Sequence, residues 1–353
     1  MPLPAQPIMD RCRQEGFSAV GICRAEPSRR EREIQAWVAA GRHGAMDWFQ
    51  AQLPQRLDPA SLLHGVKSII CVADRYSDGR PDVIDEAAYA TGKTARYARG
   101  LDYHRRMKRR LRRIVKALAA DHPQARFRPC ADIEPILERE HAQRAGLGRI
   151  GKHTLLIVPG QGSWVLLAEI LTTLEIQPTS PTPFLRDDPC GTCTACIDAC
   201  PTGAIEPWSV DASRCLSHLH IEERGPAPPG LEGQTNGWLF GCDTCQEVCP
   251  HNQPTRASRR EPIHPDYDNR LAAIPLADVI GWTASARAVA FERGALKRIT
   301  LSMARRNAIL AAVDRLIERD DETLRRAVES CIDDPDELVR ATARRGVDRL
   351  SRR

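Results

Sequence analysis

Apolar and polar residues in the N-terminal half of the chain follow patterns that predict both strands and helices. The apolar, β-branched run at residues 66–73, VKSIICVA, predicts a buried strand. Two further strands are predicted at residues 154–158 and 163–174, joined by the turn at residues 159–162, PGQG. Strands mixed with helices in this half favour an α+β fold.

Apolar residues follow helical spacing in parts of the N-terminal half and in the C-terminal region. Residues 28–40 predict a helix that opens at a serine cap and closes at Gly41. Residues 102–120 predict a long basic helix, and residues 133–145 predict another. The C-terminal helices are predicted at residues 302–319, 322–331 and 335–350. Residues 333–340 resemble the start of a HEAT-type repeat, although an ordinary helical tail fits equally well.

These patterns divide the 353-residue chain into three regions. The mixed N-terminal region covers residues 1–180, and a proline-rich stretch at residues 177–189 predicts a linker at its end. A cysteine-rich region covers residues 181–255, and a helical region covers residues 256–353. With 42% hydrophobic and 27% charged residues, the composition is that of a folded globular protein rather than a disordered one.

Three general features bear on location and partners. No apolar run reaches 18 residues, so we expect no membrane-spanning helix. The N-terminus lacks the basic-then-apolar pattern of a signal peptide, so we expect a cytoplasmic protein. The net charge of +5 permits an anionic partner without requiring one.

The 13 cysteines fall into two classes. Five are scattered, and each is expected to be a small buried apolar residue: Cys12, Cys23, Cys71, Cys130 and Cys331. The other eight lie between residues 190 and 249. Cys190, Cys193, Cys196 and Cys200, followed by Pro201, read C-x2-C-x2-C-x3-C-P, which is the bacterial ferredoxin pattern for iron–sulfur clusters.

A second, shorter run completes the pattern. Cys242, Cys245 and Cys249 precede Pro250, and Cys215 can supply the thiolate that this run lacks. In two-cluster ferredoxins the last cysteine of each run binds the other cluster. One 4Fe-4S cluster is therefore assigned to Cys190, Cys193, Cys196 and Cys249, and the other to Cys200, Cys215, Cys242 and Cys245. The alternative is a structural zinc site.

Two further motifs have the wrong context for their usual ligands. Residues 146–151 read G-x-G-x-x-G, but a predicted helix precedes them and a strand follows, the reverse of a dinucleotide site. We interpret them as a helix C-cap followed by a loop whose glycines let a ligand approach the backbone closely. Asp102 and His104 begin like the D-x-H-x-x-G cobalamin motif, but Met107 replaces its glycine. We therefore do not assign His104 as a cobalt ligand.

Several segments together resemble the epoxyqueuosine reductase family. They are residues 97–104, 132–139, 145–154 and 215–217, with both cysteine runs. The resemblance implies an oxidoreductase that reduces epoxyqueuosine to queuosine at the wobble position of certain transfer RNA anticodons. It also implies an N-terminal cobalamin-binding domain, a ferredoxin-like domain with two 4Fe-4S clusters and a short HEAT-like helical tail.

The resemblance makes Asp132 the proton donor, because the epoxide oxygen must be protonated as it leaves. An aspartate can donate at neutral pH only with a raised pKa, which burial against an apolar corrin face would provide. The plain structural alternative is that Asp132 caps a helix starting at residue 133.

The same resemblance implies the cobalamin-binding residues. Arg56 would pair with polar groups of the cofactor tail, and residues after the glycine loop and beside the cluster ligands would line the corrin. These lining residues are Lys152, His153, Thr154, Leu156, Leu167, Ser217, Gly241 and Asp243. For each of them a purely structural role is the alternative.

The basic helix acquires a role if the substrate is transfer RNA. Eight of the residues from 105 to 116 are Lys or Arg. Such a run is usually a solvated face, but on a tRNA-modifying enzyme it can contact phosphates. The residues we expect to contact tRNA are Arg105, Arg106, Lys108 and Arg224. We expect a monomer that takes electrons from a separate donor.

Two other functions are compatible with parts of the sequence. A non-catalytic carrier with two clusters would explain the cysteines, but it would leave the N-terminal half without a task. A corrinoid reductive dehalogenase would use the same cofactors on a small molecule and would not need the basic helix.

Overall fold

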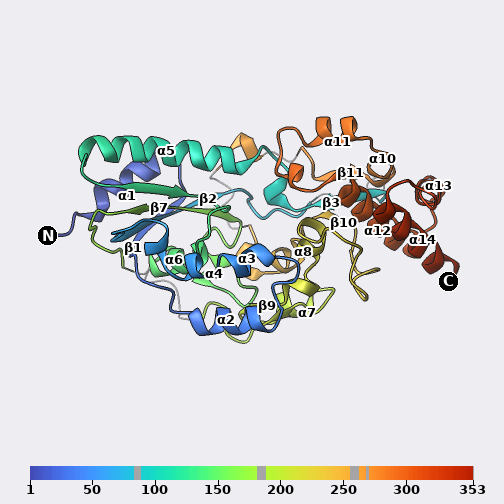
Figure 1. Cartoon of the computed structure of the whole chain (residues 1–353), viewed down its shortest axis with the longest axis horizontal. Helices are drawn as coiled ribbons and strands as arrows, with labels where there is room; N and C mark the ends of the chain where they lie inside the picture. Colours follow the sequence, from blue (N-terminus) through green and yellow to red (C-terminus); the bar gives the residue numbers. More distant parts are fainter. Residues whose placement is uncertain (83–88, 181–187, 255–261, 268–269, 353) are drawn as a thin grey trace.

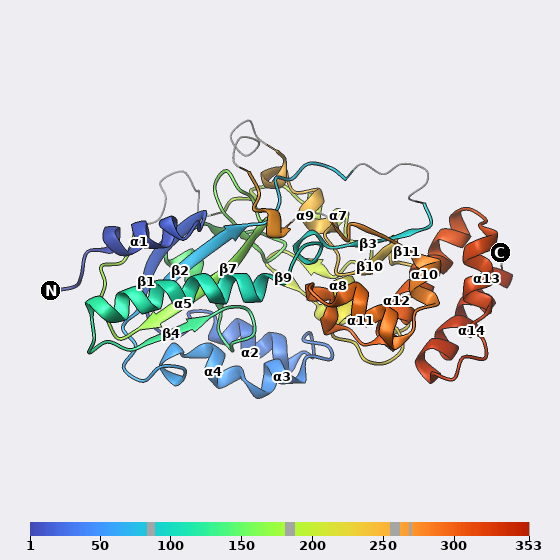
Figure 2. The same ribbon diagram turned by 90° about the horizontal axis from the view of Figure 1, so that it is seen from above.

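The computed structural model describes residues 1–82, 89–180, 188–254, 262–267 and 270–352. The molecule is elongated, with the N-terminus and the C-terminus at opposite ends (Figures 1 and 2). The main sheet lies toward the N-terminal end, and the C-terminal helices form the other end. Both strands and helices are present, so the predicted α+β class is confirmed.

A four-stranded antiparallel sheet organises the N-terminal half. Its order is β1 (Ala19–Arg24), β2 (Ser68–Arg75), β7 (Val165–Thr172) and β4 (Phe127–Cys130). All eight residues of β2 are buried because helices cover both faces of the sheet. The strands predicted at residues 66–73 and 163–174 are confirmed, each starting two residues later. The strand predicted at residues 154–158 shrinks to β6 (Leu156–Ile157), which pairs with β5 (Arg149–Ile150).

The long basic helix is α5 (Tyr103–Asp121), which lies along one face of this sheet (Figure 1). The Asp102 side chain caps it by accepting from the His104 backbone N–H. Met107, Leu111 and Ile114 form its buried stripe at helical spacing. The predicted helix is therefore confirmed within one residue at each end.

The helix predicted at residues 133–145 is wrong over its first half. Only α6 (Glu138–Arg144) forms, on the opposite face of the sheet, and its N-cap is Leu137. Asp132 has a φ of 62°, so it sits in a loop and is not the predicted helix cap. Glu134 and Glu138 accept the backbone N–H groups of Ala131 and Asp132 at 2.8 and 2.7 Å. These carboxylates hold the Asp132 loop in its non-helical conformation.

The described part of the N-terminal half also contains the short α-helices α1 (Ala5–Gln14), α2 (Glu31–Ala39), α3 (Asp47–Ala51) and α4 (Leu53–Leu57). α2 begins three residues after the predicted start, with Arg30 as its N-cap, and the Ser28 hydroxyl donates to Glu140 at 2.6 Å and accepts from the Arg30 backbone N–H at 3.1 Å. The glycine loop is confirmed as a C-cap, since Gly146 follows α6 with a φ of 81°. All five scattered cysteines are buried, as predicted.

A small sheet joins the three predicted regions. β3 (Thr91–Thr94) lies between β10 (Trp238–Phe240) and β11 (Ala273–Pro275), and each strand comes from a different region. The predicted boundaries fall at or within segments outside the described residues. The division into domains therefore stays a prediction, and the regions pack against one another through this sheet.

The C-terminal helices pack against the cysteine-rich region. They are α10 (Leu276–Ile280), α11 (Ala284–Phe291), α12 (Leu301–Glu318), α13 (Glu322–Glu329) and α14 (Glu337–Ser351), and the three predicted helices correspond to the last three. Arg306 of α12 is fully buried and donates to the carbonyl oxygens of Leu219, Glu223 and Gly225. In the described part of the chain, none of the helices has both the length and the apolarity needed to cross a bilayer.

Candidate functional site

Four cysteines surround a cavity of about 210 Å³ in the middle of the molecule. Cys190 and Cys193 lie in the loop that leads into α7 (Ala195–Asp198), Cys196 lies in α7 itself, and Cys249 lies after α9 (Thr244–Glu247). His153 also lines the cavity. Burial raises the pKa of Cys249 to about 11, and the neighbouring thiols of the first run act in the same direction. The first predicted cluster set is thus brought together around one space.

The second predicted set also gathers in one place. Cys215 precedes α8 (Leu216–Ile221), and burial raises its pKa, with the Cys200 thiol adding to the effect. Burial likewise raises the pKa of Cys245, and Cys242 and Cys215 act in the same direction. Cys196 of the first set also acts on Cys245, so the two sets adjoin. That these eight cysteines are cluster ligands stays a prediction.

Backbone and side-chain donors hold the cysteine loops. The backbone N–H of Lys152 lies 3.3 Å from the Cys190 sulfur, and the Ala204 N–H lies 3.3 Å from the Cys200 sulfur. Such N–H···S bonds stabilise thiolates and tune cluster potentials. The Lys152 ammonium donates to the carbonyl oxygens of Gly191 and Cys193. Lys152, expected to line the corrin, therefore has its ammonium committed to the first cysteine loop.

Asp132 lies in a network at the start of α5. Its Oδ2 accepts from the Tyr103 hydroxyl at 2.8 Å and lies 2.7 Å from Nε2 of His104. Burial raises the pKa of Asp132, but the hydrogen bonds from His104 and Tyr103 and the charge of His104 outweigh it. The net pKa of Asp132 is lowered here, and a raised pKa in contact with an apolar corrin face stays a prediction.

Arg56 is a buried cation near Asp132. Its guanidinium lies over the rings of Trp48 and Phe49 and donates to Gln52 at 3.2 Å. Burial lowers its pKa, while the carboxylates of Glu138 and Asp132 act in the opposite direction. Its Nε has no hydrogen-bond partner among the described residues. A buried donor without a partner suits a site that a polar ligand completes.

His153 and Thr154 lie between the glycine loop and the first cysteine set. Burial lowers the pKa of His153 to about 4, so its ring is neutral. Its Nδ1 accepts from the Leu155 N–H, which leaves Nε2 as a buried donor with no partner in the described chain. Thr154 has a φ of 67°, and its carbonyl and hydroxyl oxygens accept from Arg139.

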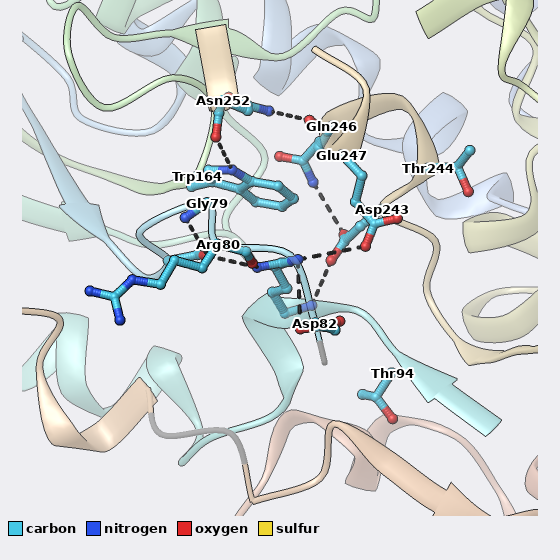
Figure 3. A network of polar contacts seen from close by, with 12 residues as sticks. Gly79, Arg80, Asp82, Thr94, Trp164, Asp243, Thr244, Gln246, Glu247 and Asn252 are labelled. Atoms are coloured by element: carbon cyan, nitrogen blue, oxygen red, sulfur yellow. Dashed lines mark hydrogen bonds and ion pairs between the residues drawn. The ribbon is translucent and has the colours of Figure 1, made fainter. Parts of the chain in front are cut away.

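The remaining predicted lining residues lie on several elements. Leu156 is buried, and Leu167 and Ser217 are half-buried. Gly241 has a φ of 66°, and a Cβ there would lie 2.6 Å from the Ala95 side chain, so only glycine fits. Asp243 is buried in a network with Gln246 and Asn252 (Figure 3), and it accepts from the Arg96 backbone at 2.7 Å.

Sequence reasoning missed four residues around Asp132. Tyr103 and His104 bind its carboxylate, and Glu138 accepts from its backbone N–H. The ring of Tyr97 packs against Tyr103 at 5.9 Å. The D-x-H spacing of Asp102 and His104 is the sequence signal for this histidine, but it does not reveal a contact with Asp132, which lies 28 residues away along the chain.

The four residues expected to contact tRNA differ in exposure. Arg105 and Arg224 are exposed. Arg106 is paired with Asp74 and Asp266, and Lys108 with Glu134. The outward face of α5 instead presents Arg105, Arg109, Arg112 and Lys116, all exposed at helical spacing.

Comparison with known proteins agrees with these observations. Residues 189–252 match the family described as 4Fe-4S double cluster binding domain, and residues 56–133 match epoxyqueuosine reductase QueG, DUF1730. An epoxyqueuosine reductase of Synechococcus sp. (strain CC9605) is 38% identical over 88% of this chain and 95% of its own length.

Two solved structures share the fold. One is an epoxyqueuosine reductase with an epoxyqueuosine-modified tRNA-Tyr stem loop, which is 26% identical with a TM-score of 0.86 and covers 98% of this chain and 89% of its own. The other, from Bacillus subtilis, has an aspartate-bearing catalytic loop swung out of the active site. It is 26% identical with a TM-score of 0.84 and covers 98% of this chain and 90% of its own. This chain therefore belongs to the epoxyqueuosine reductase family of oxidoreductases.

Proposed function

We propose that this protein reduces epoxyqueuosine to queuosine in the anticodon loop of transfer RNA, using two 4Fe-4S clusters and cobalamin. One observation carries the proposal. Burial raises the pKa of Tyr97, and the carboxylates of both Asp132 and Asp243 act in the same direction. The Tyr97 ring lies 5.9 Å from that of Tyr103, which donates to Asp132, and 6.3 Å from that of Phe240, which precedes Cys242 of the second cysteine set. Proton delivery and electron delivery can meet at one site.

Reduction of the epoxide requires both proton delivery and electron delivery. Removing an epoxide oxygen as water consumes two electrons and two protons. The clusters pass electrons one at a time, and cobalamin supplies a strongly reducing metal centre when bound. Asp132 protonates the departing oxygen as its bond to carbon breaks.

This chain offers residues that fit a corrin. The buried donors without partners at Arg56 and His153 suit polar groups of the cofactor. Leu156 and Leu167 supply apolar contact to the ring. Ser217, Gly241 and Asp243 lie beside the second cysteine set, where the reduced metal centre would receive its electrons. These residue roles are our proposal.

Substrate access requires the wobble base to leave the stack of the anticodon loop and enter the site. The loop that carries Asp132 exposes Ile133, 59% of whose surface is accessible, beside the carboxylate. The related structure with a displaced catalytic loop supports movement of this segment during entry. The exposed Arg105 and Arg224 would bind phosphates, and Arg106 and Lys108 would do so on exchanging their present partners. We also expect a cytoplasmic monomer with a separate electron donor.

The test is conversion of an anticodon stem loop that carries epoxyqueuosine. The anaerobically reconstituted protein, given a low-potential reductant and cobalamin, should yield queuosine, seen as a loss of one oxygen mass. Asp132→Asn should lower turnover by about 100-fold or more, whereas Asp348→Asn, an exposed matched control on α14, should not. Full activity of the Asp132→Asn variant would show that Asp132 is not the proton donor.

The same preparation separates the alternatives. An electron carrier would bind no cobalamin and show no cobalamin absorption spectrum. A dehalogenase would turn over small halogenated substrates and leave the stem loop unchanged. Either result would overturn the proposed function.

A further inference from the structure

The proposed reaction consumes more protons than one carboxyl can carry. A single aspartic acid delivers one proton and must be reloaded before it delivers the second. In the described structure Asp132 is held as a carboxylate, since its pKa is lowered. Because 41% of the Asp132 side chain is exposed, protons can reach it from water or from a protonated neighbour.

His104 is placed to be that neighbour. Its Nε2 lies 2.7 Å from Oδ2 of Asp132, and its Nδ1 lies 2.8 Å from Oδ1 of Asp102. The ring stacks on Tyr103 with centroids 4.0 Å apart, which fixes its orientation. About 23% of the His104 side chain is exposed, so the ring can exchange protons with water.

The charges around this ring favour its protonated form. Burial lowers the pKa of His104, but hydrogen bonds and charge from Asp102 and Asp132 outweigh it and raise the pKa to about 9. Asp102 is itself held ionised, because hydrogen bonds from His104 and Lys297 outweigh burial and lower its pKa. Lys297 reaches it from the short 3-10 helix Ala295–Arg298, and Arg298 acts on Asp132.

The hydrogen bonds to the Asp132 side chain use one of its two oxygens in the described structure. Both contacts to the Asp132 side chain, from Tyr103 and His104, are made at Oδ2. Oδ1 has no partner among the described residues and is the oxygen left to face a substrate. A proton that enters the carboxyl at Oδ2 can therefore be presented to the substrate once the carboxyl group turns about its Cβ–Cγ bond.

We propose that His104 is a proton relay that reloads Asp132 from solvent, with Asp102 and Lys297 holding it in place. The inference rests on the proposed function. In each transfer the imidazolium gives its Nε2 proton to Oδ2 of Asp132, the neutral carboxyl group turns about its Cβ–Cγ bond, and that same proton passes to the departing oxygen. His104 becomes neutral and takes the next proton from water. Two such transfers and the two electrons of the reductant convert the epoxide oxygen to water.

The first test is the pH dependence of single-turnover conversion with the reconstituted full chain. Wild-type His104 is protonated below a pH of about 9. The single-turnover rate of the wild type should therefore stay constant up to that pH and fall above it. His104→Gln should lower the rate by about 10- to 100-fold and move the decline to lower pH. His122→Gln, at the far end of α5, is the matched control and should behave as wild type.

A second readout does not depend on activity. His104 has a raised pKa when folded, so its stabilising contribution is present below the ordinary value of 6.5 and is lost as the pH rises through about 9. The melting temperature of His104→Gln should therefore fall below that of wild type at pH 6, and the gap should shrink toward pH 10.

The outcomes separate the two proposals. If wild type makes no queuosine, the proposed function fails. If wild type makes queuosine but His104→Gln keeps the wild-type rate and pH profile, the relay alone is wrong. A melting-temperature gap that does not change with pH would also contradict the relay.

Discussion

The Lys152 ammonium lies 2.9 Å from the carbonyl oxygen of Cys193 and binds the loop that carries three candidate cluster ligands. It also donates to the Gly191 carbonyl at 2.7 Å, and only 7% of the lysine surface is exposed. The residue that follows the glycine loop of the N-terminal half thus positions the first cysteine set. The two halves of the candidate site are joined by this contact.

Replacing Lys152 should therefore impair one cluster more than the other. Lys152→Met would leave the carbonyl oxygens of the cysteine loop without a donor and loosen the loop. Iron per reconstituted chain should fall from about eight toward about four atoms, measured by metal analysis. Lys67→Met is the control, because the Lys67 side chain is exposed, and it should retain the full iron content.

Arg56 should contribute to cofactor affinity. Its unpartnered Nε and buried position predict that Arg56→Gln weakens cobalamin binding by about 10- to 100-fold, or roughly 1.5–3 kcal/mol. Absorption titration of the full chain measures the dissociation constant. Unchanged affinity would mean that Arg56 is only structural, and the exposed Arg326→Gln controls for loss of charge.

Arg306 should be among the most important residues for stability. It is fully buried and donates to three carbonyl oxygens of the cysteine-rich region. Arg306→Ala leaves those carbonyls without donors, so we expect a loss of about 3 kcal/mol or more in the free energy of unfolding. Denaturant unfolding measures it. Arg326→Ala, which breaks an exposed pair, should cost less than about 1 kcal/mol.

The outward face of α5 should contribute to RNA binding. The triple variant Arg105→Gln, Arg109→Gln and Arg112→Gln removes three exposed charges, so affinity for the stem loop should fall and depend less on salt. Binding measured at several salt concentrations gives the slope. Arg319→Gln, Arg325→Gln and Arg326→Gln form the matched control at the C-terminal end. Equal slopes for both variants would exclude α5 from the interface.

Local patterns in the sequence predicted much of this structure. The strand β2 and the helix α5 follow from a β-branched run and an apolar stripe, and the grouping of the cysteines follows from their spacing. The helix predicted from residue 133 failed because Glu134 and Glu138 bond to the backbone of the Asp132 loop, which periodicity does not reveal.

Contacts between segments that are distant in the sequence could not be predicted from local patterns. The lowered pKa of Asp132 arises from His104 and Tyr103, which lie 28 and 29 residues away along the chain. The small sheet takes β3, β10 and β11 from three regions that composition alone would separate. Such pairings depend on the folded arrangement, so no local pattern could have supplied them.

The iron and cobalt content of the reconstituted full chain tests the central claim most directly. Two cubane clusters feeding one corrinoid require about eight iron atoms and about one cobalt atom per chain. A well-folded preparation that holds zinc in place of iron, or that retains no cobalt when cobalamin is supplied, would contradict the account.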